Sequence, residues 1–300
     1  MTDTLPATST TRVHRESLRR AQGLRSLKVT VWHVALIAMV IVLLYPVAWL
    51  VSASFKSSGE IFTTTQFWPQ EWTPGNYTQA LEGAGSLTFW QLLANSLILS
   101  VLSVVGNVFA CTLAGYALAR MRFRLQRPFF AFMIVTLMLP MHVILIPQYI
   151  IFQQLGLIGT FLPLVLPKFL GTEAFFVFLV VQFVRGIPRE LDEAATVDGA
   201  GPYRTFFSVI LPLLQPALIT TAIFSFIWSW NDFFGQLIFL NNPATYTVQL
   251  GLRLFIDQSS TSSYGAMFAM SVLALLPVLL FFLVFQRYLV EGVATSGLKG

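Results

Sequence analysis

The chain has 300 residues, of which 56% are hydrophobic and only 10% are charged, and its formal net charge is +5. A soluble domain usually carries about 25% charged residues, so this composition excludes an ordinary soluble protein. The single cysteine, Cys111, excludes a disulfide framework and a cysteine metal cluster; since His33 and His142 are isolated, no metal site is predicted.

A polar tail over residues 1–29 opens the chain and lacks the short apolar core and cleavage site of a cleavable signal. A helix needs roughly 20 apolar residues to cross hydrocarbon. Six segments reach that length, and we expect transmembrane helices at 30–52, 91–119, 128–152, 163–184, 213–234 and 266–286. The sequence therefore predicts an all-α, polytopic membrane helical bundle over residues 30–290, followed by a second tail at 291–300.

The basic residues are distributed unevenly between the two sides of this bundle. If the N-terminal tail is cytoplasmic, only Lys56, Lys168 and Arg253 of the 18 Lys and Arg residues fall on the other side. Cytoplasmic loops of membrane proteins carry such an excess of Lys and Arg. The positive charge thus reports topology rather than nucleic-acid binding, and it predicts that both termini and the 185–212 connection are cytoplasmic.

Prolines and polar residues distinguish some of the predicted spans. Span three contains Pro140 and Pro147, and span six contains Pro277; each proline removes a backbone donor and tends to bend its helix. Span two contains Asn95 and Asn107. For these two asparagines, internal packing is favoured, and a role in lining a solute path stays open.

The polar connection "GIPRELDEAATVDG" (residues 186–199) has the pattern of a short helix. Pro188 suits the first helical position, and Gly199 suits the left-handed residue that ends a helix. A second short helix is predicted to start at Pro202, at an angle to the first, and to stop before Pro212. The insert is thus expected to fold into two helices that project from the membrane.

The first of these helices is expected to present a face with little bulk. Its residues at i, i+3, i+4 and i+7 are Leu191, Ala194, Ala195 and Asp198, and acidic residues flank them. The insert has no nucleophile–base pair, no phosphate-binding glycine loop and no metal-ligand cluster, so no catalytic residue is predicted. Its shape instead suits a groove on another protein.

The spacing of residues within the insert is also distinctive. Glu193-Ala194-Ala195 is followed after three residues by Gly199, after nine more by Val209, and then by Leu211-Pro212. This pattern resembles the EAA loop of the membrane subunits of bacterial ABC importers that depend on a binding protein, with Val209 where isoleucine is usual. The stretches "SFKSSGEIF", "WPQEWTPGNY", "FVRGIPRELDEAATVDGAG" and "SWNDFF" extend the resemblance over nearly the whole chain, to sugar-importer permeases of the maltose-system type.

The resemblance implies the transmembrane fold of a type I ABC importer in the bacterial inner membrane. It also implies a second, different permease subunit, two copies of a cytoplasmic ATPase and an external sugar-binding protein. In that family the EAA loop is a coupling helix seated in a cleft of the ATPase, which binds ATP and magnesium; this chain would hold no cofactor and would not be an enzyme. The residues expected to couple to the ATPase are Leu191, Glu193, Ala194, Ala195, Asp198, Gly199 and Pro212.

Residues near the external ends of spans four and five are candidates for the solute path. A carboxylate inside the membrane is costly and usually faces a partner or a wet cavity, so Glu173 suits either a structural ion pair or the path. In "IWSWNDFF" (residues 227–234) the tryptophans fit an interfacial aromatic belt. Alternatively, the polar residues bind sugar hydroxyls and an indole gives an apolar platform. The path candidates are Glu173, Trp230, Asn231 and Asp232.

We therefore expect a permease subunit that moves a di- or oligosaccharide into the cell, driven by ATP hydrolysis in a partner subunit. Two alternatives stay open: an ATP-independent secondary carrier or channel, which the EAA pattern disfavours, and an ABC importer for a polyol or a glycerol-phosphate compound. A membrane enzyme is not supported, because the sequence offers no reactive constellation.

Overall fold

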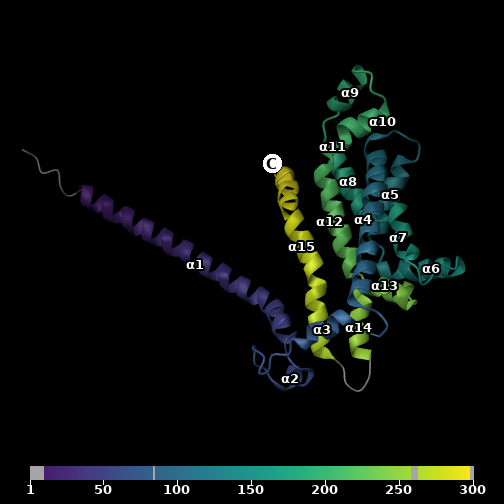
Figure 1. The fold of residues 1–300 in the computed structure, drawn as a ribbon. Helices are drawn as coiled ribbons and strands as arrows, with labels where there is room; N and C mark the ends of the chain where they lie inside the picture. Colours follow the sequence, from purple (N-terminus) through teal and green to yellow (C-terminus); the bar gives the residue numbers. More distant parts are fainter. Residues whose placement is uncertain (1–9, 84, 258–262, 298–300) are drawn as a thin grey trace, which may run out of the picture.

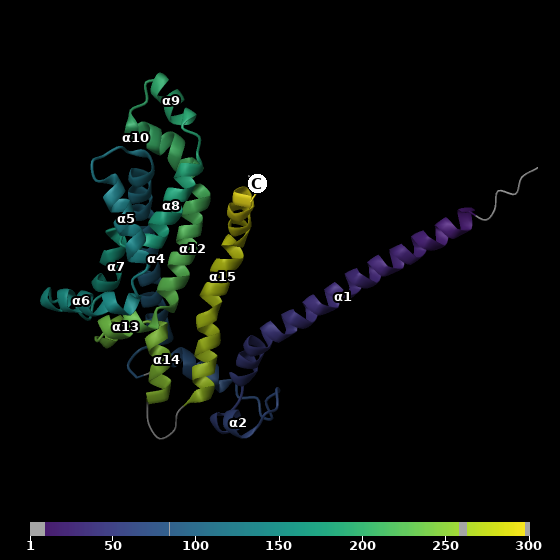
Figure 2. The same ribbon diagram turned by 180° about the vertical axis from the view of Figure 1, so that it is seen from behind.

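The computed structural model describes residues 10–83, 85–257 and 263–297. In these ranges the regular secondary structure is helical, which confirms the all-α prediction. Figures 1 and 2 show an elongated bundle with α9 and α10 at one end and α2, α3 and α14 at the other. The helices are α1 (Thr10–Ala53), α2 (Ser58–Thr63), α3 (Gly75–Glu82), α4 (Phe89–Arg120), α5 (Gln126–Leu137), α6 (Met141–Gln154), α7 (Leu162–Phe169), α8 (Ala174–Gly186), α9 (Glu190–Val197), α10 (Pro202–Thr205), the π-helical η1 (Phe206–Ile210), α11 (Leu211–Leu213), α12 (Gln215–Asn231), α13 (Phe233–Phe239), the 3-10 turn η2 (Pro243–Thr245), α14 (Val248–Asp257) and α15 (Tyr264–Gly297).

Not all the predicted spans are single straight helices. Among the described residues, the helical segments long and apolar enough to cross a membrane are Lys28–Ala53, Phe89–Arg120, Leu162–Gly186 and Tyr264–Arg287. Two bent pairs raise the number to as many as six: Gln126–Leu137 with His142–Gln154, bent by 108°, and Pro202–Leu213 with Gln215–Asn231, bent by 70°. Predicted span three is therefore broken inside, whereas the second bend lies at the start of predicted span five, between the second helix of the insert and α12.

Prolines account for both breaks. Pro140 has extended backbone angles (φ −60°, ψ 127°) just before α6, and a proline disfavours helical conformation in the residue that precedes it. Pro216, near the start of α12, has no N–H to bond the carbonyl of Pro212, so the helical ladder is interrupted near Leu214. In contrast, α6 and α15 continue through Pro147 and Pro277.

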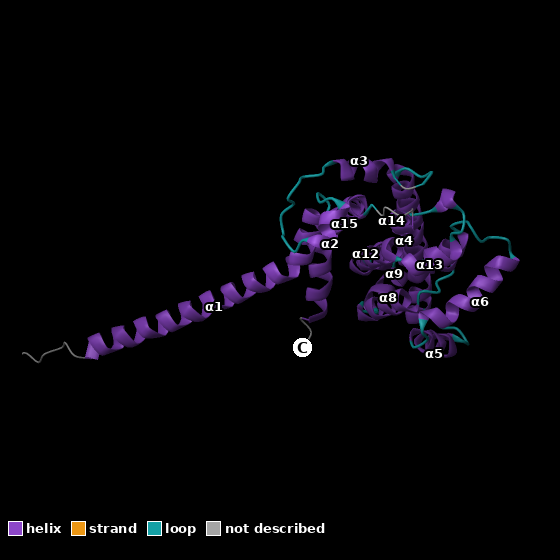
Figure 3. Ribbon diagram, turned by 90° about the horizontal axis from the view of Figure 1, so that it is seen from below, coloured by secondary structure: helices purple, strands orange, loops and turns teal. Residues whose placement is uncertain are grey.

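The first helix stands apart from the bundle, as Figure 3 shows. It begins at Thr10, so residues 10–29 of the predicted tail are helical and continuous with the membrane helix, and residues 1–9 lie outside the described residues. None of its most apolar 18-residue window is buried. α1 packs on α15 near its end, where the rings of Trp49 and Phe268 lie 5.5 Å apart. Such an apolar surface requires lipid or another protein to cover it.

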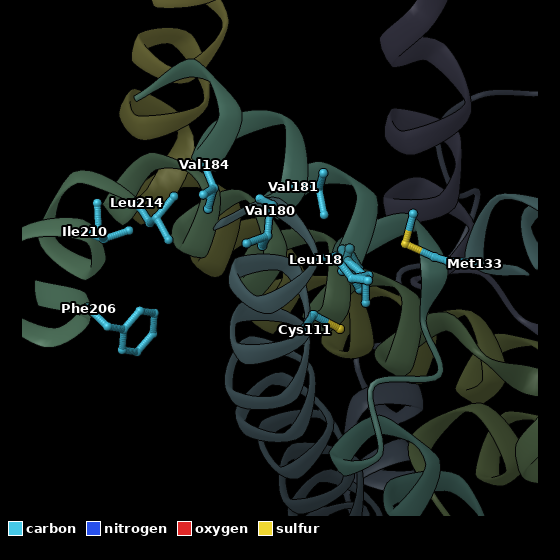
Figure 4. Packing of buried hydrophobic residues seen from close by; sticks show 12 residues of the cluster. Cys111, Leu118, Met133, Val180, Val181, Val184, Phe206, Ile210 and Leu214 are labelled. Atoms are coloured by element: carbon cyan, nitrogen blue, oxygen red, sulfur yellow. The ribbon is translucent and has the colours of Figure 1, made fainter. Parts of the chain in front are cut away.

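The bundle is organised around α4, which contacts α7, α8, α12 and α14. Toward the end that carries α9, a buried apolar cluster joins α4, α5 and α8 to the connection between spans four and five (Figure 4). That connection contributes Phe206, Ile210 and Leu214, which pack with Val180 and Val184 of α8. The polar insert is thus anchored in the core of the membrane domain.

The opposite end is closed by a folded cap. α3, the start of α4, α14 and the start of α15 share a second apolar cluster. Asn76 is buried and its Nδ2 donates to the carbonyls of Ser54 (2.9 Å) and Lys56 (2.8 Å), while the buried Lys56 ammonium donates to the Gln66 carbonyl. These bonds hold the segment after α1 against the bundle.

Candidate functional site

The polar insert forms the tip of the bundle, with α9 as its outermost helix (Figure 1). Acidic residues occupy the first turn of α9, as expected at the positive end of a helix dipole: Glu190, Asp192 and Glu193. Pro188 is not the first helical residue, because α9 begins at Glu190 and Pro188 lies in the preceding connection. That part of the prediction is wrong.

The end of α9 is fixed by Gly199. Its φ is +77°, in the left-handed region. The N–H of Ala200 donates to the carbonyl of Ala195 at 2.8 Å, and the N–H of Gly199 donates to that of Thr196 at 3.0 Å. These are the paired hydrogen bonds of a glycine-terminated helix, so the helix-ending role predicted for Gly199 is confirmed.

The second helix of the insert is longer than predicted. It begins at Pro202, as expected, but runs through η1 and α11 to Leu213, so Pro212 lies inside it and the predicted stop before Pro212 is wrong. Just before Pro212 the helix widens, because the N–H of Leu211 donates to the carbonyl of Phe206, five residues earlier. Proline is tolerated in the first turn of the segment that follows.

The predicted coupling residues do not share one exposed face. Leu191, Glu193, Ala194, Asp198, Gly199 and Pro212 are exposed, whereas Ala195 is buried, with 8% of its surface exposed. Ala195 follows Asp192 by one helical step of three residues, so both lie on the side of α9 that faces the bundle. The expectation that Ala195 belongs to the outward face is therefore wrong.

A buried arginine determines which side of α9 faces inward. The Nη1 of Arg120, at the end of α4, lies 2.9 Å from Oδ2 of Asp192. Its Nη2 donates to the carbonyl of Val184 at 3.1 Å and to that of Ile187. From the sequence, Arg120 is only one of the basic residues that indicate membrane orientation. It lies far from Asp192 in the chain, so helical spacing could not predict that the two side chains pair.

The tip also exposes large apolar side chains that the sequence analysis did not single out. Val197 is 87% exposed, Tyr203 is 83% exposed and Phe207 is 59% exposed. The helical spacing of Tyr203 and Phe207, four residues apart, is the signal that could have indicated a shared face. α9 contacts α10 and η1, and Glu193 and Asp198 of the α9 segment are also exposed. The tip thus exposes apolar and acidic side chains, a mixture that protein–protein contacts use.

Glu173 lies where α7 and α8 meet, between the two ends of the bundle rather than at the external end of span four: its carbonyl faces Cys111 of α4, and Lys168 lies against Gly106 of α4. The chain leaves helical geometry between Phe169 and Ala174, with Gly171 at φ +67°. The carboxylate of Glu173 forms an ion pair with the ammonium of Lys168, and the two side chains are 28% and 25% exposed. The structure thus supplies the ion-pair partner that one of the two alternatives for Glu173 requires.

The other path candidates differ in exposure. Trp230 is 2% exposed and stacks on Phe226 at 5.6 Å, so its ring is covered in this conformation. Asn231 is exposed, and Oδ1 of Asp232 accepts from the N–H of Gly235 at 2.8 Å. The structure therefore covers the ring of Trp230 and leaves Asn231 exposed, while the carboxylate of Asp232 caps the start of α13.

An exposed aromatic pair has one member close in the chain to the ion pair between Glu173 and Lys168. Trp228 is 46% exposed, and its ring lies 5.4 Å from that of Phe175, which follows Glu173 closely in the chain. The sequence analysis considered Trp228 only for an aromatic belt. Of the two indoles, Trp228 is therefore the exposed one and Trp230 the covered one.

Between the two ends, α4 and α12 are joined by polar side chains. Asn107 Nδ2 donates to Ser225 Oγ at 2.8 Å, and Ser229 Oγ donates to Ser103 Oγ at 3.1 Å. Asn95 donates to the carbonyls of Ala244 and Tyr246. Both asparagines of span two thus make internal contacts. Among the described residues, no three His, Cys, Asp or Glu side chains gather as metal ligands.

Comparison with known proteins finds a match over residues 106–295 to the family described as "Binding-protein-dependent transport system inner membrane component". The "Probable ABC transporter permease protein YurM" of Bacillus subtilis (strain 168) is 34% identical over 90% of this chain and 88% of its own length. The "Diacetylchitobiose uptake system permease protein DasC" of Streptomyces coelicolor is 33% identical over 92% and 99%. Among solved structures, a bacterial ABC transporter for import of the acidic polysaccharide alginate superposes with a TM-score of 0.74 at 25% identity, over 95% of this chain and 99% of that one.

Proposed function

Because the chain belongs to the family of inner membrane components of binding-protein-dependent transport systems, we propose that it is one of two different permease subunits of an ABC sugar importer. The observation that carries this proposal is the tip formed by α9 and α10. Its EAA pattern lies on an exposed helix, next to apolar side chains that this chain leaves uncovered. This surface is the docking site for a cytoplasmic ATPase, present in two copies, that binds ATP and magnesium.

The basic residues support this orientation. Arg122 and Arg124, in the connection after α4, and Arg127, at the start of α5, are exposed at the same end of the bundle as α9. Since cytoplasmic loops are enriched in Lys and Arg, this end and both termini face the cytoplasm of a bacterial cell. The folded cap at the opposite end then faces the external sugar-binding protein.

The mechanism follows from how the tip is anchored. Closure of the ATPase dimer moves α9, and the apolar cluster around Phe206, Ile210 and Val184 transmits this displacement to α8 and α4. The bundle thereby favours a state in which the path opens outward, and hydrolysis restores the inward-open state. Nucleotide drives this cycle only through its different affinities for the two states, so the tip must remain docked in both.

The proposed solute is a di- or oligosaccharide. The relatives named for diacetylchitobiose uptake and for alginate import both support a carbohydrate. The exposed indole of Trp228, with Asn231 and Asp232 close in the chain, offers an apolar platform beside hydrogen-bonding groups. Trp230 would contribute only if its ring became uncovered during the cycle. Glu173, which is paired with Lys168, lies two residues before Phe175, whose ring is next to that of Trp228.

The uncovered surface of α1 supports a second permease subunit. α1 leaves its apolar side chains exposed along most of its length. Part of this surface is covered by lipid, and the remainder suits an apolar face of the second permease.

The test is uptake by proteoliposomes that contain both permeases and the ATPase, with the binding protein and its co-purifying ligand outside. We expect uptake that requires ATP. Glu193→Ala is expected to reduce uptake and ATPase stimulation while the protein still inserts, whereas Arg124→Gln, which removes an exposed charge outside α9, leaves both unchanged. Uptake without nucleotide would instead indicate a secondary carrier. A polyol or glycerol-phosphate ligand on the binding protein would correct the substrate class.

A further inference from the structure

Arg120 differs from the other arginines at its end of the bundle. Arg122, Arg124 and Arg127 are exposed, as residues that set membrane orientation should be. The side chain of Arg120 is only 7% exposed. Burying a guanidinium group is costly unless it is paired and hydrogen-bonded, so its place in the fold needs a reason beyond topology.

The contacts of Arg120 join three helices at one point. It is the last residue of α4, it donates to the carbonyls of Val184 and Ile187 at the end of α8, and it pairs with Asp192 in the first turn of α9. The end of α8 carries the negative partial charge of a helix C-terminus, which favours a cation. The planar fork of arginine allows one side chain to serve the carboxylate and the carbonyls together.

Without this contact, α9 would be held less firmly. Only the short connection from Ile187 to Arg189 links α8 to α9, and Ile187 already has extended backbone angles. α4 has no covalent connection to α9 nearby, so Arg120 provides its direct link to that helix. Asp192 and Ala195 face inward, and the opposite side of α9 stays free for docking.

We propose that the Arg120–Asp192 ion pair is a positioning element that makes α9 move as one body with α4 and α8. It thereby sets how much ATP is hydrolysed for each solute imported. This inference rests on the proposed function, because it requires an ATPase to act on α9. Neither residue contacts solute or nucleotide; both act by fixing the angle of the docking helix.

The test uses the complete complex in proteoliposomes. Asp192→Asn keeps the shape of the side chain and removes its charge. We expect it to raise the ATP hydrolysed per solute imported by about tenfold, as loss of a hydrogen bond to a charged group would, while the ATPase still co-purifies. Arg120→Lys keeps a cation but loses the fork, so an intermediate ratio is expected. Arg124→Gln is the control, because it removes an exposed charge at the same end of the bundle from a residue outside α9.

A second measurement reports on α9 without transport. Spin labels at two exposed positions, Thr196 in α9 and Met121 directly after α4, report the distance between α9 and the end of α4. We expect Asp192→Asn to broaden the distribution of distances between them and Arg124→Gln to leave it narrow. A wild-type ATP-to-solute ratio with an unbroadened distribution in Asp192→Asn would overturn the inference, and so would an equal effect of Arg124→Gln. If the wild-type complex itself neither bound the ATPase nor used ATP, the proposed function would fail instead.

Discussion

Replacing Gly199 with alanine isolates the conformational requirement at the end of α9. Gly199 has a φ of +77°, and no atom lies within 4 Å of the position that a Cβ would occupy. A clash therefore adds nothing, and the cost is that of placing a residue with a Cβ in the left-handed region, about 1–2 kcal/mol. This corresponds to a population of the opened helix end that rises by a factor of about 5–30.

The assay is amide hydrogen exchange in the assembled complex, followed over residues 190–200. The N–H groups of Gly199 and Ala200 close the end of α9, so their exchange should accelerate by the same factor of about 5–30 in Gly199→Ala. Gly199→Asn should have a smaller effect, since asparagine adopts the left-handed region more readily. Gly186→Ala is the control: Gly186 also has open space around its Cβ position, but it is helical.

Two outcomes would refute this reasoning. Equal acceleration in Gly199→Ala and Gly186→Ala would show that any added methyl group at this end has the effect. A larger effect of asparagine than of alanine would show that side-chain chemistry, rather than backbone conformation, dominates at Gly199.

The remaining predictions concern the bundle and the solute path. Glu173→Gln should leave the apparent affinity for solute and the protein level unchanged, because the partner of the carboxylate is Lys168 and glutamine keeps an oxygen that can accept from it; a raised KM for uptake would place Glu173 in the path. Trp230→Ala should destabilise the fold by about 3–5 kcal/mol and lower the protein level, because the ring is buried. Trp228→Ala should keep the protein level and raise the KM for uptake. The reverse pattern would contradict the proposal that Trp228 is the indole that contacts the solute. Gly115→Ala should lower the thermal midpoint of the purified protein, through about 1–3 kcal/mol of overpacking, because its Cβ would lie 2.6 Å from Val180 Cγ1; Gly59→Ala, with open space, is the control.

The parts of the fold that follow local rules could be predicted from the sequence. Apolar length indicated the spans, and the conformational freedom of glycine indicated the end of α9 at Gly199. The break at Pro140 was foreshadowed by the proline itself, but Pro147 and Pro277 have the same chemistry and their helices continue. Whether a proline breaks a helix depends on neighbouring contacts that a sequence does not list.

The arrangement of side chains around the site depends on tertiary contacts, and there the sequence was less informative. Helical spacing placed Ala195 with Ala194 on one face, but the pair between Asp192 and Arg120 rotates that side toward the bundle. Similarly, Trp228 and Trp230 are equivalent by composition. Only the packing of Trp230 against Phe226 shows which ring is covered.

In the proposed transport cycle, the position of α4 explains how a movement of α9 can reach the candidate solute path. α4 starts in the folded cap, where Thr88 and Gln91 cap it, and ends at Arg120 beside α9. Between these ends it meets α12 through Asn107–Ser225 and Ser103–Ser229, and α12 carries Trp228 and Asn231. Buried polar pairs are costly to separate, so a displacement of α4 draws α12 with it. A loose loop at the tip could be displaced by the proposed ATPase partner without moving α4. Because Arg120 holds α9 to the end of α4, a displacement of α9 moves α4 as well.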